Sequence, residues 1–271
     1  MDTSLAALVR QHDPDRFLTV LFAPPPKRDA LLALYAFNHE LARAREVASE
    51  PTLALIRLQW WREVVEGAPR HHVVATPLRA AIAANLLPRK TLLAMIDARE
   101  IEAEPRIDTL DDWRGYVLAG AGGVAVAAAS LLDAPQPEAA RPFGAAYGVA
   151  GLLRNWRPLA AQGRCLLPAD LLAGHGLSIE AAIAAPESPA LQTVLALLAE
   201  EGRALLRQGA GMPPRGPAIA AVPPPRGPAI AAVLPAVLAR RDLRRWPRQA
   251  PPRRGFGDRL AVVLAGFRGR L

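Results

Sequence analysis

Apolar residues at helical spacing, interrupted by proline and glycine, constrain this sequence more than any other feature. Alternating runs of Val, Ile and Thr between turn residues, which are typical of strands, are almost absent. The pattern therefore predicts an all-α protein. Of the 271 residues, 51 % are apolar, which is enough for a sizeable core.

The periodic stretches predict a series of helices whose ends are set by proline and by capping residues. The three prolines Pro24–Pro26 end any regular structure that precedes the first predicted helix, Lys27–Ala48. Asp13 and Ser188 are candidate N-caps, and Ser178 with Glu180 can open a short turn. The predicted helices cover Lys27–Ala48, Pro51–Glu66, Pro77–Asn85, Arg89–Glu102, Asp111–Leu132, Pro137–Ala161, Ser188–Arg207, Pro228–Arg245 and Gly257–Phe267.

The stretch Gly115–Leu132 carries no charge and approaches the length that spans a bilayer. It is mostly Ala and Gly, which are weakly hydrophobic, so a core helix packed through small residues is the better interpretation. Within it, Gly120–Ala125 matches the pattern GxGxxA. A dinucleotide-binding fingerprint must follow a strand. The residues before this motif predict a helix, so we reject a nucleotide site there.

The ten residues PPRGPAIAAV occur twice, at Pro213–Val222 and at Pro224–Val233. Two copies are too few for a solenoid and indicate a tandem duplication. The second copy leads into an apolar run and is predicted to belong to a helix. The first is predicted to be an extended surface loop. We thus expect a single domain over residues 1–271, with a proline-rich duplicated loop at about 211–227.

The net charge of +8 is concentrated near the C-terminus. From Arg203 to Leu271, fourteen arginines face only Asp242 and Asp258, a balance of +12, so residues 1–202 sum to −4. This imbalance favours contact with an anionic membrane surface or an acidic partner. The alternative is a solvated, arginine-rich helix surface. RNA-binding signatures are absent, so nucleic acid is not an expected partner.

Several common catalytic and targeting patterns are missing. A lone cysteine, Cys165, excludes a disulfide framework and a cysteine-cluster zinc site. The five histidines form no HExxH or i,i+4 pair, and there is no GxSxG motif. The N-terminal residues have no basic region followed by an apolar run, so we expect no signal peptide and a cytoplasmic protein.

Four segments together resemble the squalene/phytoene synthase family, from about Asp15 to Leu172 and more loosely beyond. The resemblance implies an all-helical, isoprenoid-synthase-type bundle around one central cavity. Family synthases join two prenyl diphosphates head to head, using Mg²⁺ held by two aspartate-rich motifs on facing helices. The segments are FAPPPKRDALLALYAF (Phe22–Phe37), AFNHELARARE (Ala36–Glu46), IRLQWWRE (Ile56–Glu63) and GVAGLLRNWRPLAAQGRCLLPADLL (Gly148–Leu172).

The sequence departs from the family pattern where those aspartates are expected. The first motif would bring paired aspartates near Ala42 and Arg43 and another near Glu46, and only Glu46 is acidic. The second motif should fall between Asn155 and Gly163, but no Asp or Glu occurs from Ala139 to Ala169. A three-magnesium site cannot be assembled from these residues. We expect no metal, no cofactor and no catalytic residue beyond the remnant Glu46.

One branch of the family matches better. The segment Phe37–Glu63 resembles the phytoene-synthase-like assembly factors of respiratory complex I and their bacterial relatives. These share an FNxEL core, a following SE pair and an RxQxW segment, which fall here on Phe37–Leu41, Ser49-Glu50 and Arg57–Trp60. The match implies a synthase fold put to non-synthase use, with a respiratory-complex subunit as a partner.

On the helix predicted for Lys27–Ala48, one face carries Tyr35, Asn38, Ala42 and Glu46 and would look into the cavity. Two interpretations stay open. Arginines can replace magnesium in a metal-free site for a diphosphate or lipid head group. Alternatively, Glu40 or Glu46 pairs with Arg154 or Arg157 and fills a dead active site, which we favour. The candidate cavity residues are Tyr35, Asn38, His39, Arg43, Arg154, Arg157 and Arg164.

Two functions are therefore carried forward. The first is a family member without synthase activity, acting as an assembly-type factor or as a binder of a prenyl lipid or diphosphate at the inner face of the membrane. The alternative is a prenyl transferase of the squalene/phytoene class, which would require Mg²⁺. Activity with farnesyl or geranylgeranyl diphosphate separates them.

Overall fold

The computed structural model describes residues 4–48, 50–211, 224–246 and 254–271. In this part of the chain there is no strand, only an isolated bridge between Ile107 and Pro168, and the all-α prediction is confirmed. The α-helices are α1 (Leu5–His12), α2 (Pro14–Val20), α3 (Arg28–Glu46), α4 (Pro51–Glu66), α5 (Ala75–Ala83), α6 (Arg89–Glu100), α7 (Leu110–Ala119), α8 (Ala121–Leu131), α9 (Arg141–Arg154), α10 (Trp156–Ala161), α11 (Ala169–Ala173), α12 (Ile179–Ala184), α13 (Pro189–Gly209), α14 (Pro235–Arg245) and α15 (Phe256–Arg268). Short 3₁₀ helices are η1 (Pro25–Lys27), η2 (Ile101–Ala103), η3 (Pro137–Ala140) and η4 (Gly227–Ala232).

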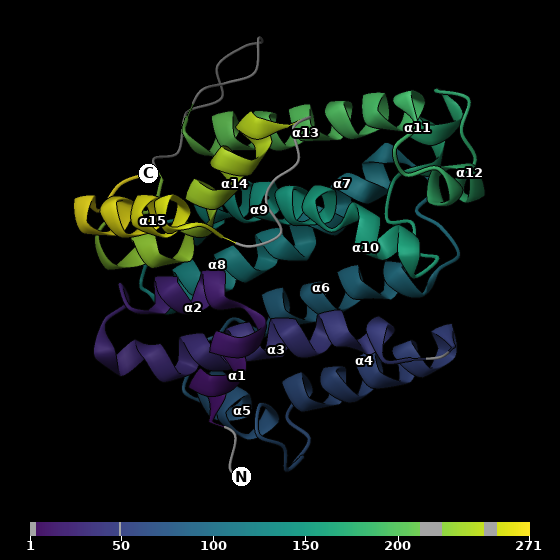
Figure 1. Cartoon of the computed structure of the whole chain (residues 1–271). Helices are drawn as coiled ribbons and strands as arrows, with labels where there is room; N and C mark the ends of the chain where they lie inside the picture. The colour runs from purple at the N-terminus through teal and green to yellow at the C-terminus, as the bar shows by residue number, and fades with distance from the viewer. Residues whose placement is uncertain (1–3, 49, 212–223, 247–253) are drawn as a thin grey trace.

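The long helices stack in successive layers (Figure 1). α13 packs on α9, α9 on α8, and α8 on both α6 and α3, while α3 is covered on its other side by α4 and α5. At one end of the stack, α15 packs against α14 and α2. This order brings helices from the N-terminal, middle and C-terminal parts of the chain around one interior space: α2, α3, α6, α7, α9 and α15.

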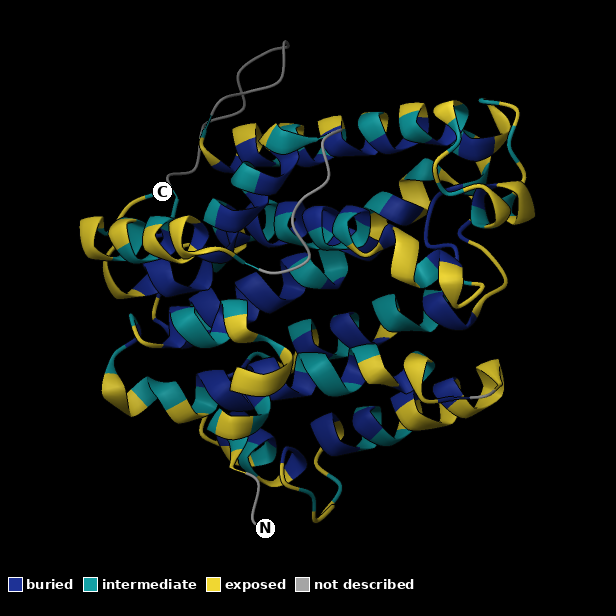
Figure 2. Ribbon diagram, in the orientation of Figure 1, coloured by how far each residue is buried: buried dark blue, intermediate teal, exposed yellow. Residues whose placement is uncertain are grey.

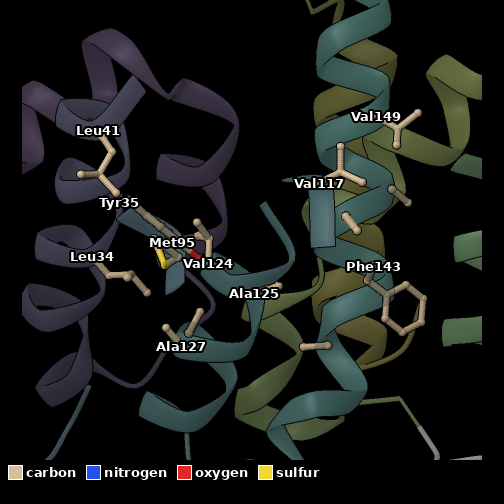
Figure 3. Close-up of a cluster of buried hydrophobic side chains, with 14 of the residues drawn as sticks. Leu34, Tyr35, Leu41, Met95, Val117, Val124, Ala125, Ala127, Phe143 and Val149 are labelled. Atoms are coloured by element: carbon tan, nitrogen blue, oxygen red, sulfur yellow. The ribbon is translucent and has the colours of Figure 1, made fainter. Parts of the chain in front are cut away.

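The apolar core runs through the middle of the stack (Figure 3). Leu34 and Leu41 of α3 point toward α8, and Phe143 and Val149 of α9 lie beyond it. α8 and α9 approach very closely because Gly144 faces Ala121 and Ala125. A Cβ atom on Gly144 would lie 2.5 Å from the carbonyl oxygen of Ala121. The small residues of this region therefore serve backbone packing, as the sequence predicts.

Side-chain caps fix several helix starts. Asp13 accepts a hydrogen bond from the backbone N–H of Arg16, and Ser188 accepts one from Leu191. Ser178 caps α12 by accepting from the backbone N–H of Ala181. These three capping predictions are confirmed. The predicted helix ranges begin at Lys27, and Asp13 was the one helix signal given before Pro24, whereas the structure has α1 and α2 in that segment.

The predicted helix Asp111–Leu132 is divided at Gly120, whose backbone dihedrals leave the helical region. A Cβ atom there would lie 2.9 Å from the carbonyl oxygen of Tyr116, so glycine suits the break. The GxGxxA motif thus joins two helices, and the rejection of a nucleotide site is consistent with this. By length and composition alone, Leu110–Leu131 is the one span candidate within the described residues, and 67 % of its most apolar window is buried in the protein.

Two other predicted helices are also divided. Pro137–Ala161 splits into η3, α9 and α10, with the second break at Asn155. Pro228–Arg245 begins as η4, which carries the buried residues Ala229–Ala232 of the second repeat copy, and continues as α14. All ten positions of the first copy lie outside the described residues, so its predicted loop structure stays a prediction. Residue 49 of the SE pair also lies outside them.

Candidate functional site

A cavity of about 1060 Å³ opens between α1–α2, α3, α6–η2, α7, α9–α10 and the start of α15. One part of its wall is apolar and the other is lined by charged side chains. Such a space suits an amphiphile with an anionic head and a hydrocarbon tail. The apolar part of the wall includes Phe17, Leu18, Leu21, Val117, Leu152, Leu159, Leu166 and Leu238.

α3 turns one face into this cavity. Asn38, Ala42 and Glu46 recur at four-residue spacing and all line it, as predicted from the helical register. His39 also lines it, and its ring stacks on that of His12 with centroids 4.3 Å apart. Burial, and then the nearby His12, lower the pKa of His39, which keeps this imidazole neutral near pH 7.

A buried ion cluster centred on Glu102 forms the inner charged wall. Arg99 Nη1 lies 2.5 Å from one carboxylate oxygen, and Arg164 Nη2 lies 2.8 Å from the other. The Tyr116 hydroxyl donates to Glu102 at 2.8 Å. Burial alone would raise the pKa of Glu102, but the charge of Arg99 and the hydrogen bonds outweigh it and hold this pKa below its ordinary value.

A second cluster joins α2, α9, α14 and the start of the C-terminal segment. Arg254 Nε lies 3.0 Å from Asp15, and its Nη1 lies 2.6 Å from Asp242. Arg154 Nη1 lies 3.3 Å from Asp242, and the Tyr147 hydroxyl donates to Asp15 at 3.0 Å. The Nη2 atom of Arg254 is buried without a hydrogen-bond partner in the described structure.

The cavity carries more positive than negative charge. Among the described residues that line it, seven are arginines and four are carboxylates. Three of those carboxylates and the buried Asp242 pair with five of these arginines, while Arg10 and Arg259 have no carboxylate contact among the described residues, so the remaining positive charge favours an anionic ligand. The arginines are Arg10, Arg16, Arg99, Arg154, Arg164, Arg254 and Arg259, and the carboxylates are Asp13, Asp15, Glu46 and Glu102.

These residues fit a magnesium site poorly. Mg²⁺ requires carboxylate oxygens that are free to coordinate it. Asp13 is bound by Arg16 at 2.8 Å, and Asp15 and Glu102 are held in the two clusters. Glu46 is the one cavity carboxylate without an arginine contact within the described residues. No group of three or more His, Cys, Asp or Glu side chains in that part of the chain is placed to hold a metal ion.

Four of the seven residues predicted for the cavity line it: Asn38, His39, Arg154 and Arg164. Tyr35, Arg43 and Arg157 are not among the described lining residues. Tyr35 is buried in the core, where the guanidinium of Arg16 lies 5.8 Å from its ring centroid. The register of α3 turns Arg43 away from the cavity. Arg157 follows the break at Asn155 and pairs with Glu187.

The expected pairing of Glu40 or Glu46 with Arg154 or Arg157 differs from what the structure contains. Glu40 contacts Arg43 on its own helix at 3.4 Å. Arg154 pairs with Asp242 instead, because α14 packs directly on α9. Arg154 and Arg157 are therefore neutralised by Asp242 and Glu187, and not by the predicted acids of α3.

Sequence reasoning missed the acids that organise the two clusters. Glu102 ends a predicted helix, and nothing in its neighbourhood marks it as buried. Asp15 follows the predicted capping residue Asp13 by two positions, in a segment for which no helix range was predicted. Asp242 carried a usable signal, since it is a lone acid within the arginine-rich run Arg240–Arg245 and sits at a buried helical position.

An all-helical bundle around one amphiphile-sized cavity defines an isoprenoid-synthase-type protein. Residues 9–261 match the squalene/phytoene synthase family, and the chain belongs to that family. It is similar over 97 % of its length to a ligand-bound dehydrosqualene synthase structure, with a TM-score of 0.75, 16 % identity and 94 % of that chain covered. A squalene synthase from Alicyclobacillus acidocaldarius gives a TM-score of 0.66 at 20 % identity, covering 98 % of this chain and 92 % of the other. These likenesses establish the shared fold.

Curated relatives include proteins of a different role. The human NADH dehydrogenase (ubiquinone) complex I, assembly factor 6, is 29 % identical over 181 residues, which are 64 % of this chain and 54 % of the human protein. The rat protein of the same name is 28 % identical over 221 residues, 79 % of this chain and 66 % of its own length. The chain thus spans about half the length of the human relative. A presqualene diphosphate synthase from Sinorhizobium fredii is 23 % identical over 171 residues, 60 % of this chain and 61 % of that enzyme.

Proposed function

We propose that this protein binds an anionic prenyl lipid or prenyl diphosphate without metal, and that it serves the assembly of a respiratory complex rather than synthesis of a terpenoid. Its place would be the cytoplasmic face of the inner membrane. The observation that carries the proposal is the cavity itself, which combines an apolar wall with seven arginines against four carboxylates.

The arrangement of the arginines supports binding over turnover. Ionising an allylic diphosphate requires strong stabilisation of the departing charge, which family synthases obtain from magnesium on clustered carboxylates. Here arginines contact Asp13, Asp15 and Glu102. Guanidinium groups hold diphosphate oxygens well, but equal binding of ground state and transition state does not accelerate a reaction.

The assembly role is supported by similarity to the assembly factors named above. The same chain can contact a protein partner through its surface and hold a ligand in its cavity. A protein partner in a respiratory complex and a lipid ligand are therefore parts of one proposal.

Ligand binding is tested by titrating the purified protein with farnesyl and geranylgeranyl diphosphate, with EDTA or with Mg²⁺. We expect binding that EDTA leaves unchanged. Arg154→Ala and Arg164→Ala should each weaken it by about tenfold or more, the loss of one charge-assisted contact. Arg157→Ala is the matched control, because Arg157 pairs with Glu187 outside the lining. Equal weakening by all three variants, or binding that requires Mg²⁺, would contradict a metal-free arginine site.

The assembly role is tested by deleting the gene in its own cells and measuring assembled complex I in isolated membranes by native electrophoresis and NADH-quinone oxidoreductase activity. We expect a loss that the wild-type gene restores and the Arg154→Ala, Arg164→Ala double variant does not. Unchanged complex I with altered terpenoids would favour the alternative, a prenyl transferase that joins two prenyl diphosphates head to head.

A further inference from the structure

The C-terminal helix α15 exposes an apolar stripe. Phe256 and Phe267 are 82 % and 81 % exposed, and Leu260 and Leu264 are 42 % and 43 % exposed. Their spacing places all four on one face of the helix. Isolated exposed apolar residues are ordinary, but two nearly fully exposed phenylalanines on a single face are a specific feature. Figure 2 shows the exposed residues along the outer side of α15.

The opposite face of α15 anchors it to the protein. Asp258 is 3 % exposed and pairs with Arg241 at 2.6 Å and with Arg245 at 3.3 Å, both on α14. Val262 is fully buried. Gly266 lies against the ring of Phe22, where a Cβ atom would come within 2.4 Å. The helix is therefore held in place, and its apolar stripe is directed outward by fixed contacts.

Basic residues flank the stripe. Arg259 lies on one side of it and Arg268 on the other, and both are exposed, as is Arg270 just beyond the helix. The single acidic residue of α15 is the buried, paired Asp258. An apolar face bordered by arginines is the pattern of helices that lie in the interface of an anionic bilayer.

α15 also borders the cavity, through its anchored face and the flanking Arg259. Arg259 and Val262 of α15 line it together with Leu18 of α2, and Leu21, which is 53 % exposed, lies where the cavity reaches the surface. The edge of Phe22 packs against Phe267, with ring centroids 5.6 Å apart, so the turn after α2 and the end of α15 form one surface.

We propose that this surface, the stripe Phe256, Leu260, Leu264 and Phe267 with Leu21 and the flanking arginines, docks on an anionic lipid bilayer. The cavity then opens beside the lipid headgroups, and an amphiphile can enter without crossing water. The inference deepens the proposed function by giving the ligand its route, but docking itself is independent of whether the cavity is filled.

Vesicle flotation tests the docking surface. The full-length protein should float with vesicles of phosphatidylglycerol and phosphatidylcholine, and less so as salt rises. The double variant Phe256→Ser, Leu264→Ser should lower the partition coefficient by about tenfold or more, since both substitutions remove apolar surface that would be buried in the bilayer. Ile56→Ser, Leu53→Ser is the matched control, because these residues are also exposed but lie on α4.

A fluorescent probe tests the orientation. The native Cys165 is buried, and burial raises its pKa to about 11, so it labels slowly. An environment-sensitive fluorophore on Phe256→Cys should shift to the blue on anionic vesicles, whereas one on Ile56→Cys should not. Equal flotation of wild type and the Phe256→Ser, Leu264→Ser variant would overturn the proposal. So would a blue shift at position 56 alone.

Failure of docking is distinguishable from failure of the proposed function. Titration with farnesyl diphosphate in solution reports on the cavity alone, and flotation reports on the surface alone. If the protein floats through its α15 face but binds no diphosphate, the docking surface is supported and the proposed ligand is wrong.

Discussion

Arg164 donates a hydrogen bond to Glu102 at 2.8 Å and thereby ties the loop after α10 to η2, which follows α6. Arg99 holds the other carboxylate oxygen of the same side chain. Because Glu102 neutralises two largely buried guanidinium groups, the local structure of the inner cavity wall depends on one carboxylate.

Glu102→Ala should therefore destabilise the protein strongly. It leaves Arg99 and Arg164 without their shared partner, and breaking a buried ion pair costs about 3–5 kcal/mol. Urea denaturation measures the change in the free energy of unfolding. Glu187→Ala is the control, because it breaks an exposed pair with Arg157 and should cost less than about 1 kcal/mol. Similar losses in both variants would show that the buried cluster contributes no more than a surface pair.

The same cluster predicts a pH dependence. The pKa of Glu102 lies lower in the folded protein than its ordinary value, so the unfolded state binds its proton more readily. Its stabilising contribution is complete above the unfolded pKa of about 4.3 and is lost as the pH falls through the lower folded value. Melting temperatures measured from pH 6 downward should fall in that acid window, and Glu102→Gln should show a shallower fall. Parallel curves for the two proteins would assign the acid sensitivity to other carboxylates.

Gly144→Ala tests the close approach of α8 and α9. The new Cβ atom would lie 2.5 Å from both the Ala121 carbonyl oxygen and the Ala125 Cβ, so one helix must move. Such overpacking costs about 1–3 kcal/mol or more. Gly151→Ala, on the same helix but with no atom within 4 Å of its new Cβ, should be neutral or stabilising by up to about 1 kcal/mol. Thermal denaturation of the two variants makes the comparison, and a stable Gly144→Ala would contradict it.

The two repeat copies allow a matched test. Ile230 of the second copy is 2 % exposed, so Ile230→Ala should cost about 2–5 kcal/mol. The corresponding change in the first copy is Ile219→Ala, and the predicted surface loop makes it nearly silent. Deleting residues 213–223 should likewise leave the melting temperature almost unchanged, because loop length has a small entropic effect. A large fall after the deletion would show that the first copy packs on the core.

The helical class and most helix positions could be predicted because apolar periodicity and capping residues are local signals. Pro51–Glu66 was predicted with its observed bounds, and Asp13, Ser178 and Ser188 cap the helices they were expected to open. The break at Gly120 was not predicted. A Cβ atom at this position would lie 2.9 Å from the carbonyl oxygen of Tyr116, so glycine suits the break, and apolar spacing does not register this.

The cavity-lining residues could be predicted from helical register only on α3, because register decides which side chains of one helix share a face. Arg154 and Arg164 were placed there by family resemblance, and their partners were not identified. Asp242 and Glu102 come from segments 88 and 62 residues away in the chain, so only the packing of α14 on α9 and of η2 beside the α10 loop brings them together. Long-range ion pairs of this kind leave no local pattern.

The last prediction concerns catalysis: we expect no magnesium-dependent condensation of prenyl diphosphates. Glu46 is the one cavity carboxylate free of an arginine contact in the described structure, and a single exposed carboxylate is a weak site for a hard cation. Incubation with radiolabelled farnesyl or geranylgeranyl diphosphate, with and without Mg²⁺, measures pyrophosphate release. Ala139–Ala169 supplies no carboxylate that could complete a metal site. Magnesium-dependent release at an enzyme-like rate, abolished by Glu46→Ala and retained in Glu40→Ala, would show that Glu46 anchors a working metal site and that the prenyl transferase alternative is correct.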